Sequence, residues 1–186
     1  MTTTPPKTMK TNLIFRYLRY DWPLHFFLLI TNWLPNNVIF MRLRGALARP
    51  FFGSCGKHLT LERNLDFRYP NNIFIGENVF IGVGSVFLAI GRIHIADKVL
   101  IAPYCVIATG NHTYFNGAYR NGAQDVKSVS VGHGSWLGSH VVLTPGATVG
   151  SGTCVAAGAV VVGKIDDNMV AGGIPARVIK KTNEQE

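Results

Sequence analysis

Branched aliphatic residues recur at every sixth position in the C-terminal half of the chain. Positions 131, 137, 143, 149, 155 and 161 are Val, Leu, Leu, Val, Val and Val. Four residues after each of the first five comes a small or β-branched residue: Ser135, Val141, Ala147, Thr153 and Ala159. Neither the 3.6-residue period of a helix nor the two-residue period of a simple strand gives this pattern. A repeat of six predicts a parallel β-helix, in which stacked coils bury one row of aliphatic side chains.

The same repeat extends towards the N-terminus with two irregularities. Spacing of six links three further sets of residues: a ragged Leu61, Phe67 and Ile73, then Ile75, Ile81 and Phe87, then Ile95, Ile101 and Ile107. An eight-residue step separates the last two sets and predicts a bulge or widened turn near residues 89–92. Residues 108–130 lack the repeat and are rich in Asn and Gly. We expect a loop extruded from the coils there, and such loops often carry functional residues.

Residues 12–49 follow a different pattern, in which Trp, Phe, Leu and Tyr are mixed with Arg. Their longest apolar stretch, residues 26–30, is far shorter than the roughly 20 residues that cross a bilayer. We expect two or three short amphipathic helices, which could lie in a membrane surface or cap the first coil. The predicted organisation is therefore a basic helical segment over 1–54, a β-helix over 55–181 with its loop at 108–130, and a tail over 182–186.

Composition and charge limit the classes of molecule to which the chain could bind. The 186 residues are 47% hydrophobic and only 15% charged, which favours oligomerisation or membrane contact. Of the net charge of +8, +6 belongs to the first 50 residues. That distribution argues against a nucleic-acid surface on the β-helix, and no nucleic-acid-binding motif accompanies it. The Thr- and Pro-rich opening lacks the features of a secretory signal, so a cytoplasmic location is expected. The three cysteines form neither a disulfide framework nor a metal clip.

The candidate chemistry lies in the extruded loop, where Asn111-His112-Thr113-Tyr114 directly follows a repeat strand. Histidine titrates near neutral pH and is the usual general base. The chain has no Gly-x-Ser-x-Gly elbow and no Cys/His nucleophile signature, so acyl transfer would be direct. His94, His112 and His133 could approach one another across coils. No two histidines stand four or five residues apart, however, and no metal site is predicted.

The segment WLGSHVVLTPGATVGSGTCVAAGAVVVGKIDDNMVAGGIPARVIKK, residues 136–181, resembles the terminal signature of the hexapeptide-repeat acyltransferases. The resemblance covers about residues 55–181. It is strongest to galactoside, maltose and other sugar O-acetyltransferases and to polysaccharide-biosynthesis acetyltransferases, and only the last group resembles residues 1–54. The resemblance implies a left-handed parallel β-helix and a homotrimer. It also implies transfer of an acyl group, usually acetyl, from coenzyme A to a hydroxyl or an amine.

On the acceptor side, the resemblance implies that His112 is the catalytic base that takes the proton of the acceptor hydroxyl. Asn111, Tyr114 and Trp136 would line the active site around it. Packing at a coil corner is an equal interpretation of Trp136. Sugar-specific relatives hold the acceptor with an Asn and an Asp, but this sequence has Gly82 and Ile90 near those positions.

On the donor side, the resemblance implies that backbone groups around Ser139 and Ala157 bind the pantetheine arm. The N–H groups near Ser139 would also stabilise the oxyanion. Arg177 and Lys180 match basic positions that reach the nucleotide phosphates, as expected for cations beside a diphosphate. An ordinary solvated tail is the other interpretation of Lys180. The Thr-Lys-Asp that usually follows the last coil is replaced by residues 162–164, Val-Gly-Lys, which predicts altered contacts to the adenine end.

The sequence thus predicts an acetyl-CoA-dependent O-acetyltransferase acting on a sugar of a surface polysaccharide or its lipid-linked precursor. It would work as a cytoplasmic homotrimer, peripheral at the inner face of the membrane through residues 12–49. Three alternatives stay open: an N-acetyltransferase of an amino sugar, a metal-dependent β-helix enzyme of the γ-carbonic anhydrase kind, and a non-catalytic trimeric scaffold.

Overall fold

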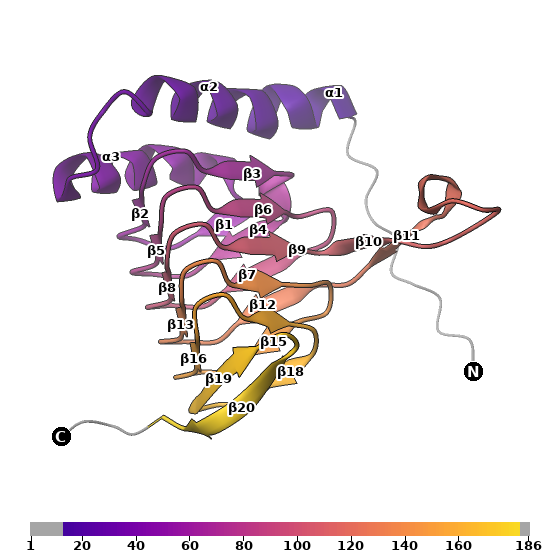
Figure 1. Cartoon of the computed structure of the whole chain (residues 1–186). Coiled ribbons are helices and arrows are strands. Elements are labelled where there is room, and N and C mark those ends of the chain that lie inside the picture. The colour runs from indigo at the N-terminus through magenta and orange to yellow at the C-terminus, as the bar shows by residue number, and fades with distance from the viewer. Residues whose placement is uncertain (1–12, 183–186) are drawn as a thin grey trace.

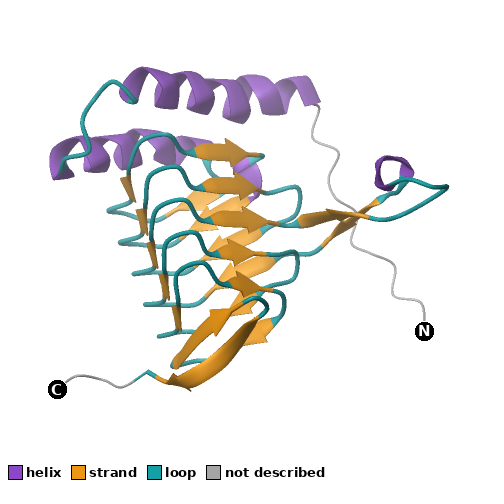
Figure 2. Cartoon of the chain, in the orientation of Figure 1, coloured by secondary structure: helices purple, strands orange, loops and turns teal. Residues whose placement is uncertain are grey.

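Short strands wind through six stacked coils and form a three-sided prism (Figure 1). The computed structural model describes residues 13–182, so residues 1–12 and most of the predicted C-terminal tail lie outside the described part of the chain. Each coil strand pairs in parallel with the strand one coil further along. The predicted parallel β-helix of hexapeptide repeats is confirmed, with the helices gathered at its N-terminal end (Figure 2).

Three sheets form the faces of the prism, which we name A, B and C in the order in which the chain visits them. Face A contains β1 (Ser54–Cys55), β4 (Ile73–Ile75), β7 (Ile93–Ile95), β12 (Val129–Val131), β15 (Thr148–Val149) and β18 (Lys164–Ile165). Face B contains β2 (Thr60–Leu61), β5 (Phe80–Ile81), β8 (Leu100–Ile101), β13 (Trp136–Leu137), β16 (Cys154–Val155), β19 (Met169–Gly173) and β20 (Ala176–Lys181). Face C contains β3 (Asp66–Arg68), β6 (Val86–Leu88), β9 (Val106–Ala108), β14 (Val142–Leu143) and β17 (Val160–Val161).

The repeat positions form the core of the prism. The six aliphatic residues from Val131 to Val161 are at most 2% exposed, and so are the five small or β-branched residues that follow them. Each aliphatic side chain buried in this way stabilises the fold by about 1.5–3 kcal/mol relative to an exposed one. Coils approach closely at the corners, where a Cβ on Gly138 would lie 2.6 Å from the Ala157 nitrogen. The six-residue repeat therefore arises because each face of a coil contributes one inward-pointing aliphatic side chain, and these stack into a buried row along each face.

The corner between faces B and C is tight. Tyr104 and His140 both adopt the left-handed backbone conformation there, with φ of 61°, and their rings stack with centroids 5.2 Å apart. Gly84 and Gly158 take the same conformation on neighbouring coils. This repeated turn lines up equivalent backbone groups along the corner, one for each coil.

Two long helical segments cover the N-terminal end of the prism (Figure 1). The first runs without a break through α1 (Leu13–Arg16), a π-helical turn η1 (Tyr17–Asp21) and α2 (Trp22–Thr31). The second is α3 (Val38–Ala48), followed by the 3₁₀ turn η2 (Arg49–Phe51). Leu24, Leu28 and Ala48 join the same core as the coils. Within residues 13–182, no helix has the length and apolar character needed to cross a membrane.

The predicted extruded loop is a hairpin that projects from the corner between faces C and A (Figure 1). Its strands β10 (Gly110–His112) and β11 (Gln124–Val126) pair antiparallel, with a 3₁₀ turn η4 (Tyr119–Asn121) between them. The coils resume at β12, as the sequence predicts. A second 3₁₀ turn, η3 (Pro70–Asn72), lies at the same corner between β3 and β4. At the other end of the prism, β20 folds back on β19 after Pro175.

Candidate active site

His112 lies on the hairpin strand β10, opposite Gln124 of β11, and its side chain is exposed. It borders a groove of about 400 Å³ between the hairpin and the two first coils. The other lining residues are Arg68, Tyr69, Leu88, Ile90, Gly110 and Gln124. The groove therefore brings the predicted base together with a cation, a phenol and an amide, beside the apolar Leu88 and Ile90.

Thr109 anchors the hairpin that carries His112. Its hydroxyl donates to the Leu88 carbonyl at 2.9 Å and accepts from the Gly91 N–H at 2.8 Å, and its own carbonyl accepts from the Lys127 N–H at 2.9 Å. Thr109 is fully buried. Both strands of the hairpin are thus held to the preceding coil, which fixes where His112 lies.

The other hairpin residues predicted on the acceptor side lie further from the groove. Asn111 is exposed on β10 opposite Asp125. Tyr114 lies beyond the strand, 65% exposed, with its ring edge-on to Tyr119 at 5.3 Å. Neither residue lines the groove that His112 borders.

Ser139 and Ala157 lie at the corner between faces B and C, on successive coils. No acceptor within residues 13–182 is hydrogen-bonded to either backbone N–H, whereas the next N–H groups along the chain bond to Pro103 and to the Ser139 carbonyl. The equivalent position two coils earlier, Val83, donates its N–H to Glu62 at 2.7 Å, and Pro103 has no N–H. Ser139 and Ala157 therefore offer two aligned backbone donors at this corner.

Trp136 and the terminal cations lie on face B, the sheet that leads to this corner. Trp136 points outward from face B on β13, 51% exposed, in register with Leu100 and Cys154 of the neighbouring coils. Arg177 and Lys180 are exposed on β20, which adds to the same sheet beyond β19. The residues predicted to hold the donor therefore follow face B and its edge along the coil axis.

The two halves of the predicted site are not joined within one copy. His112 leaves the prism at the corner between faces C and A, whereas Ser139 and Ala157 lie at the corner between faces B and C, so face C separates them. Within one copy, the predicted base and the two backbone donors therefore lie at different corners of the prism.

No protein-family profile matches the chain. It is 32% identical over 143 residues to the galactoside O-acetyltransferase of Escherichia coli, covering 77% of this chain and 70% of that protein. It is 28% identical over 157 residues to the putative colanic acid biosynthesis acetyltransferase WcaF of Escherichia coli, covering 84% of each. The chain belongs to the hexapeptide-repeat acetyltransferases. Among solved structures, it superposes on a galactoside acetyltransferase in complex with coenzyme A with a TM-score of 0.78 at 27% identity, covering 95% of this chain and 86% of the other.

Membership of the hexapeptide-repeat acetyltransferases confirms the predicted family and enzyme class. Within residues 13–182, no three His, Cys, Asp or Glu side chains come together as a metal site would require. His94 lies on face A and His133 follows β12, whereas His112 is out on the hairpin.

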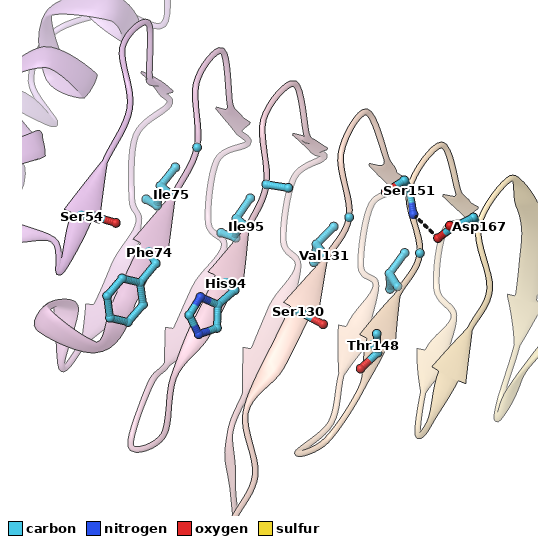
Figure 3. A pocket seen from close by; sticks show the side chains of 15 residues that line it. Ser54, Phe74, Ile75, His94, Ile95, Ser130, Val131, Thr148, Ser151 and Asp167 are labelled. Atoms are coloured by element: carbon cyan, nitrogen blue, oxygen red, sulfur yellow. Dashed lines mark hydrogen bonds between the residues drawn. The ribbon is translucent and has the colours of Figure 1, made fainter. Parts of the chain in front are cut away.

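Another groove of this hexapeptide-repeat acetyltransferase, about 570 Å³, runs along face A and contains none of the predicted site residues. The rings of Phe74 and His94 stack in it at 4.8 Å (Figure 3). At its far end Asp167 accepts a hydrogen bond from the Ser151 N–H at 2.8 Å (Figure 3). The buried side-chain atoms that have no hydrogen-bond partner in residues 13–182, Arg49 Nε and Asn71 Oδ1, belong to residues outside the lining of this groove.

Sequence reasoning missed the three other polar residues that line the groove of His112. Arg68 and Tyr69 come from the first coil, and Gln124 comes from the returning strand of the hairpin. Of the two residues near the positions where sugar-specific relatives have an Asn and an Asp, Ile90 lines the groove. The other, Gly82, is buried beside Pro103. The only signal for Arg68 in the sequence was a polar pair, Asp66 and Arg68, flanking an inward-facing Phe67.

Proposed function

We propose that this enzyme transfers an acetyl group from acetyl-coenzyme A to a sugar hydroxyl of a surface polysaccharide or its precursor, with His112 as the general base. The observation that carries the proposal is His112 on an anchored hairpin beside a groove large enough for a sugar ring. Relatives named galactoside O-acetyltransferase and colanic acid biosynthesis acetyltransferase support the acceptor class. A solved relative that holds coenzyme A supports the donor.

In the proposed reaction, His112 takes the proton of the acceptor hydroxyl as its oxygen attacks the thioester carbonyl. A backbone N–H near Ser139 stabilises the oxyanion of the tetrahedral intermediate. When the intermediate collapses, the C–S bond breaks and the thiolate takes the proton from the imidazolium, leaving the acetyl ester and free coenzyme A. General-base help of this kind contributes about 10²–10⁴-fold, and holding both substrates in one cleft contributes further.

The donor would lie along the edge between faces B and C. With the Ser139 N–H directed at the oxyanion, the unpaired Ala157 N–H suits an amide carbonyl of an extended pantetheine arm. Arg177 and Lys180, exposed at the C-terminal end of the prism, suit the phosphates of the nucleotide. Trp136 is exposed on the face between them and would form a wall of the cleft.

A homotrimer would complete the site. Face C carries an outward column of half-buried valines, Val86, Val106, Val142 and Val160. If three copies turn this face to a common axis, the hairpin of one copy meets the corner of Ser139 on the next, as in any closed head-to-tail ring. Each cleft then receives His112 from one protomer and the donor edge from its neighbour.

The proposed location is the cytoplasm, at the inner face of the membrane. Precursors of surface polysaccharides that are carried on a lipid lie at that surface. Exposed apolar side chains on the N-terminal helices support a peripheral contact there.

The test is to incubate the enzyme with acetyl-coenzyme A and matched pairs of neutral sugars and amino sugars, and to identify products by mass spectrometry. We expect an acetyl ester, which hydroxylamine cleaves. A hydroxylamine-resistant amide formed in preference would establish N-acetyl transfer instead. No product from any acceptor, together with no coenzyme A binding by calorimetry, would favour the non-catalytic scaffold.

A further inference from the structure

The outer surface of the N-terminal helices is apolar. Trp33 is 91% exposed, Ile39 75% and Ile30 71%, and more than half of Trp22 and Phe26 is exposed as well. The opposite side of α2 packs on the coils through Leu24 and Leu28, so Trp22, Phe26 and Ile30 of that helix face away from the prism. We name this surface the helical platform. Soluble proteins rarely expose a contiguous apolar surface of this kind unless it binds something.

A cationic groove of about 330 Å³ lies beside α3, and its lining residue Arg42 is one helical turn after Ile39 of the platform. Arg42 and Arg49 reach it from α3 and η2, and Lys57 and His58 from the turn of the first coil. Of these described lining residues none is acidic. Arg49 donates to the Cys55 carbonyl at 3.2 Å, but its Nε is buried with no hydrogen-bond partner in residues 13–182. An anion in the groove would add charge-assisted hydrogen bonds to these cations.

The other charged residues of the helices add to the positive charge around this groove. Asp21, the one acidic residue of the first 50, is paired with Arg16 at 3.1 Å. Arg44 is buried and donates only to neighbouring carbonyls and Asn36. Arg19 and Arg42 are exposed. The platform thus combines exposed Trp, Phe and Ile with two exposed cations, Arg19 and Arg42, that form no ion pair within residues 13–182.

We propose that the helical platform docks on an anionic lipid bilayer, with Trp33 and Ile39 entering the interface and a lipid headgroup phosphate bound between Arg42, Arg49 and Lys57. Interfacial helices combine these residue types, and anionic leaflets attract such cations. The proposal extends the peripheral placement of the proposed function, but lipid binding and acetyl transfer are separate measurements.

The fold also orients the active site relative to such a bilayer. A trimer whose axis runs along the coils presents its three platforms at the same end, so that all three can contact one flat surface. The hairpin of His112 leaves the third coil. Neighbouring strands are about 4.8 Å apart, so His112 lies roughly 10 Å beyond the first coil along the axis. A sugar carried on a lipid anchor would therefore approach the cleft from the side of the platform.

The test is vesicle flotation of the full chain at low and high salt, with phosphatidylcholine vesicles and with vesicles in which phosphatidylglycerol replaces part of that lipid. We expect flotation with the anionic vesicles, weakened by salt. Trp33→Ser/Ile39→Ser should lower the affinity at least tenfold. Arg42→Gln/Lys57→Gln should lower it by about 25-fold, about fivefold for each cation. The matched controls Phe115→Ser and Lys98→Gln/Lys164→Gln should change it less than twofold.

Three results would overturn the docking proposal. One is a wild-type chain that does not float with anionic vesicles at low salt. This result overturns the proposal even if calorimetry shows that the groove binds inorganic phosphate. Another is an equal loss in the control charge pair, which would indicate general charge attraction instead of the groove. The third is a change in mass by light scattering for Trp33→Ser/Ile39→Ser, which would make the platform a contact between copies. Coenzyme A release with a soluble acceptor should stay at the wild-type rate in these variants, so failure of docking and failure of the proposed function are distinguishable.

Discussion

Cys55 and Cys105 are both sheltered from solvent, and burial raises the pKa of each thiol to about 11. Burial also raises the pKa of Cys154. Since the thiolate is the nucleophilic form, these thiols are protonated and inert at neutral pH. This agrees with direct transfer between the two substrates, without an acyl-cysteine intermediate.

The raised pKa of Cys105 predicts a loss of stability at alkaline pH. The folded chain holds the thiol proton up to about pH 11, whereas the unfolded thiol releases it near pH 9.0. The stabilisation is complete below pH 9 and decreases as pH rises towards 11, by about 1.4 kcal/mol at pH 10. Urea unfolding at pH 7.5 and pH 10 measures this difference, which Cys105→Ala should reduce by that amount. An unchanged difference in the variant would contradict the assignment.

Arg44 ties the helical cap to the first coil through backbone carbonyls of Thr31, Leu34, Pro35 and Leu61. Burial is the main reason that its pKa is lowered, but the guanidinium stays charged. Arg44→Met would leave several carbonyls unpaired and should reduce the free energy of unfolding by about 3 kcal/mol. The exposed Arg42→Met is the control and should stay within about 0.5 kcal/mol. Equal losses in the two variants would contradict this role.

The sequence could predict some residues of the candidate site and not others. His112 could be found because it follows a repeat strand and has a side chain suited to a base. Arg68, Tyr69 and Gln124 could not, because they meet His112 only through the stacking of coils and the return of the hairpin. The open N–H groups of Ser139 and Ala157 depend on backbone conformation at a corner, and the sequence suggested them only by resemblance.

The hairpin is the element that determines where the base acts. Its two strands are held at the base by Thr109 and by Val126, which packs against the corner at Gly91. Loop residues of this kind catalyse well only when a rigid scaffold fixes them.

Thr109→Val keeps the shape of that side chain but removes both hydroxyl hydrogen bonds. We expect kcat to fall about tenfold, because His112 is less well positioned, while the KM for acetyl-coenzyme A is unchanged. Thr60→Val, on the outer side of face B, is the control and should change neither. Steady-state kinetics with circular dichroism to check folding makes the measurement. A normal kcat for Thr109→Val would contradict the anchoring role.

The coils and the helices differ in how well the sequence predicted them. The six-residue period identified the coil strands from β2 to β17, because each coil repeats the same burial requirement, but it gave neither β1 nor the strands after β17. The N-terminal pattern predicted two or three short helices, and the structure has two helical segments, the first of which is one long unbroken run from Leu13 to Thr31. Pro23 does not end it, since it lies just after a π-helical turn, where the hydrogen-bond register has shifted by one residue.

At the scale of the whole molecule, face C and its two corners predict an assembly on which activity depends. Val106→Lys places a charge in the valine column of face C without touching the core. We expect the wild-type chain to have three times the protomer mass of 20.4 kDa by light scattering, and the variant to be a monomer with little activity. Glu77→Lys, at the exposed corner between faces A and B, should stay trimeric and active. A Val106→Lys variant with the wild-type mass would contradict this use of face C.

The most direct test of the central claim is the rate of coenzyme A release for His112→Gln, compared with His25→Gln on the exposed surface of α2. If His112 is the general base, kcat should fall at least a hundredfold while binding of coenzyme A by calorimetry is unchanged. His25→Gln should stay within twofold of the wild type. Near-normal turnover by His112→Gln would contradict the account.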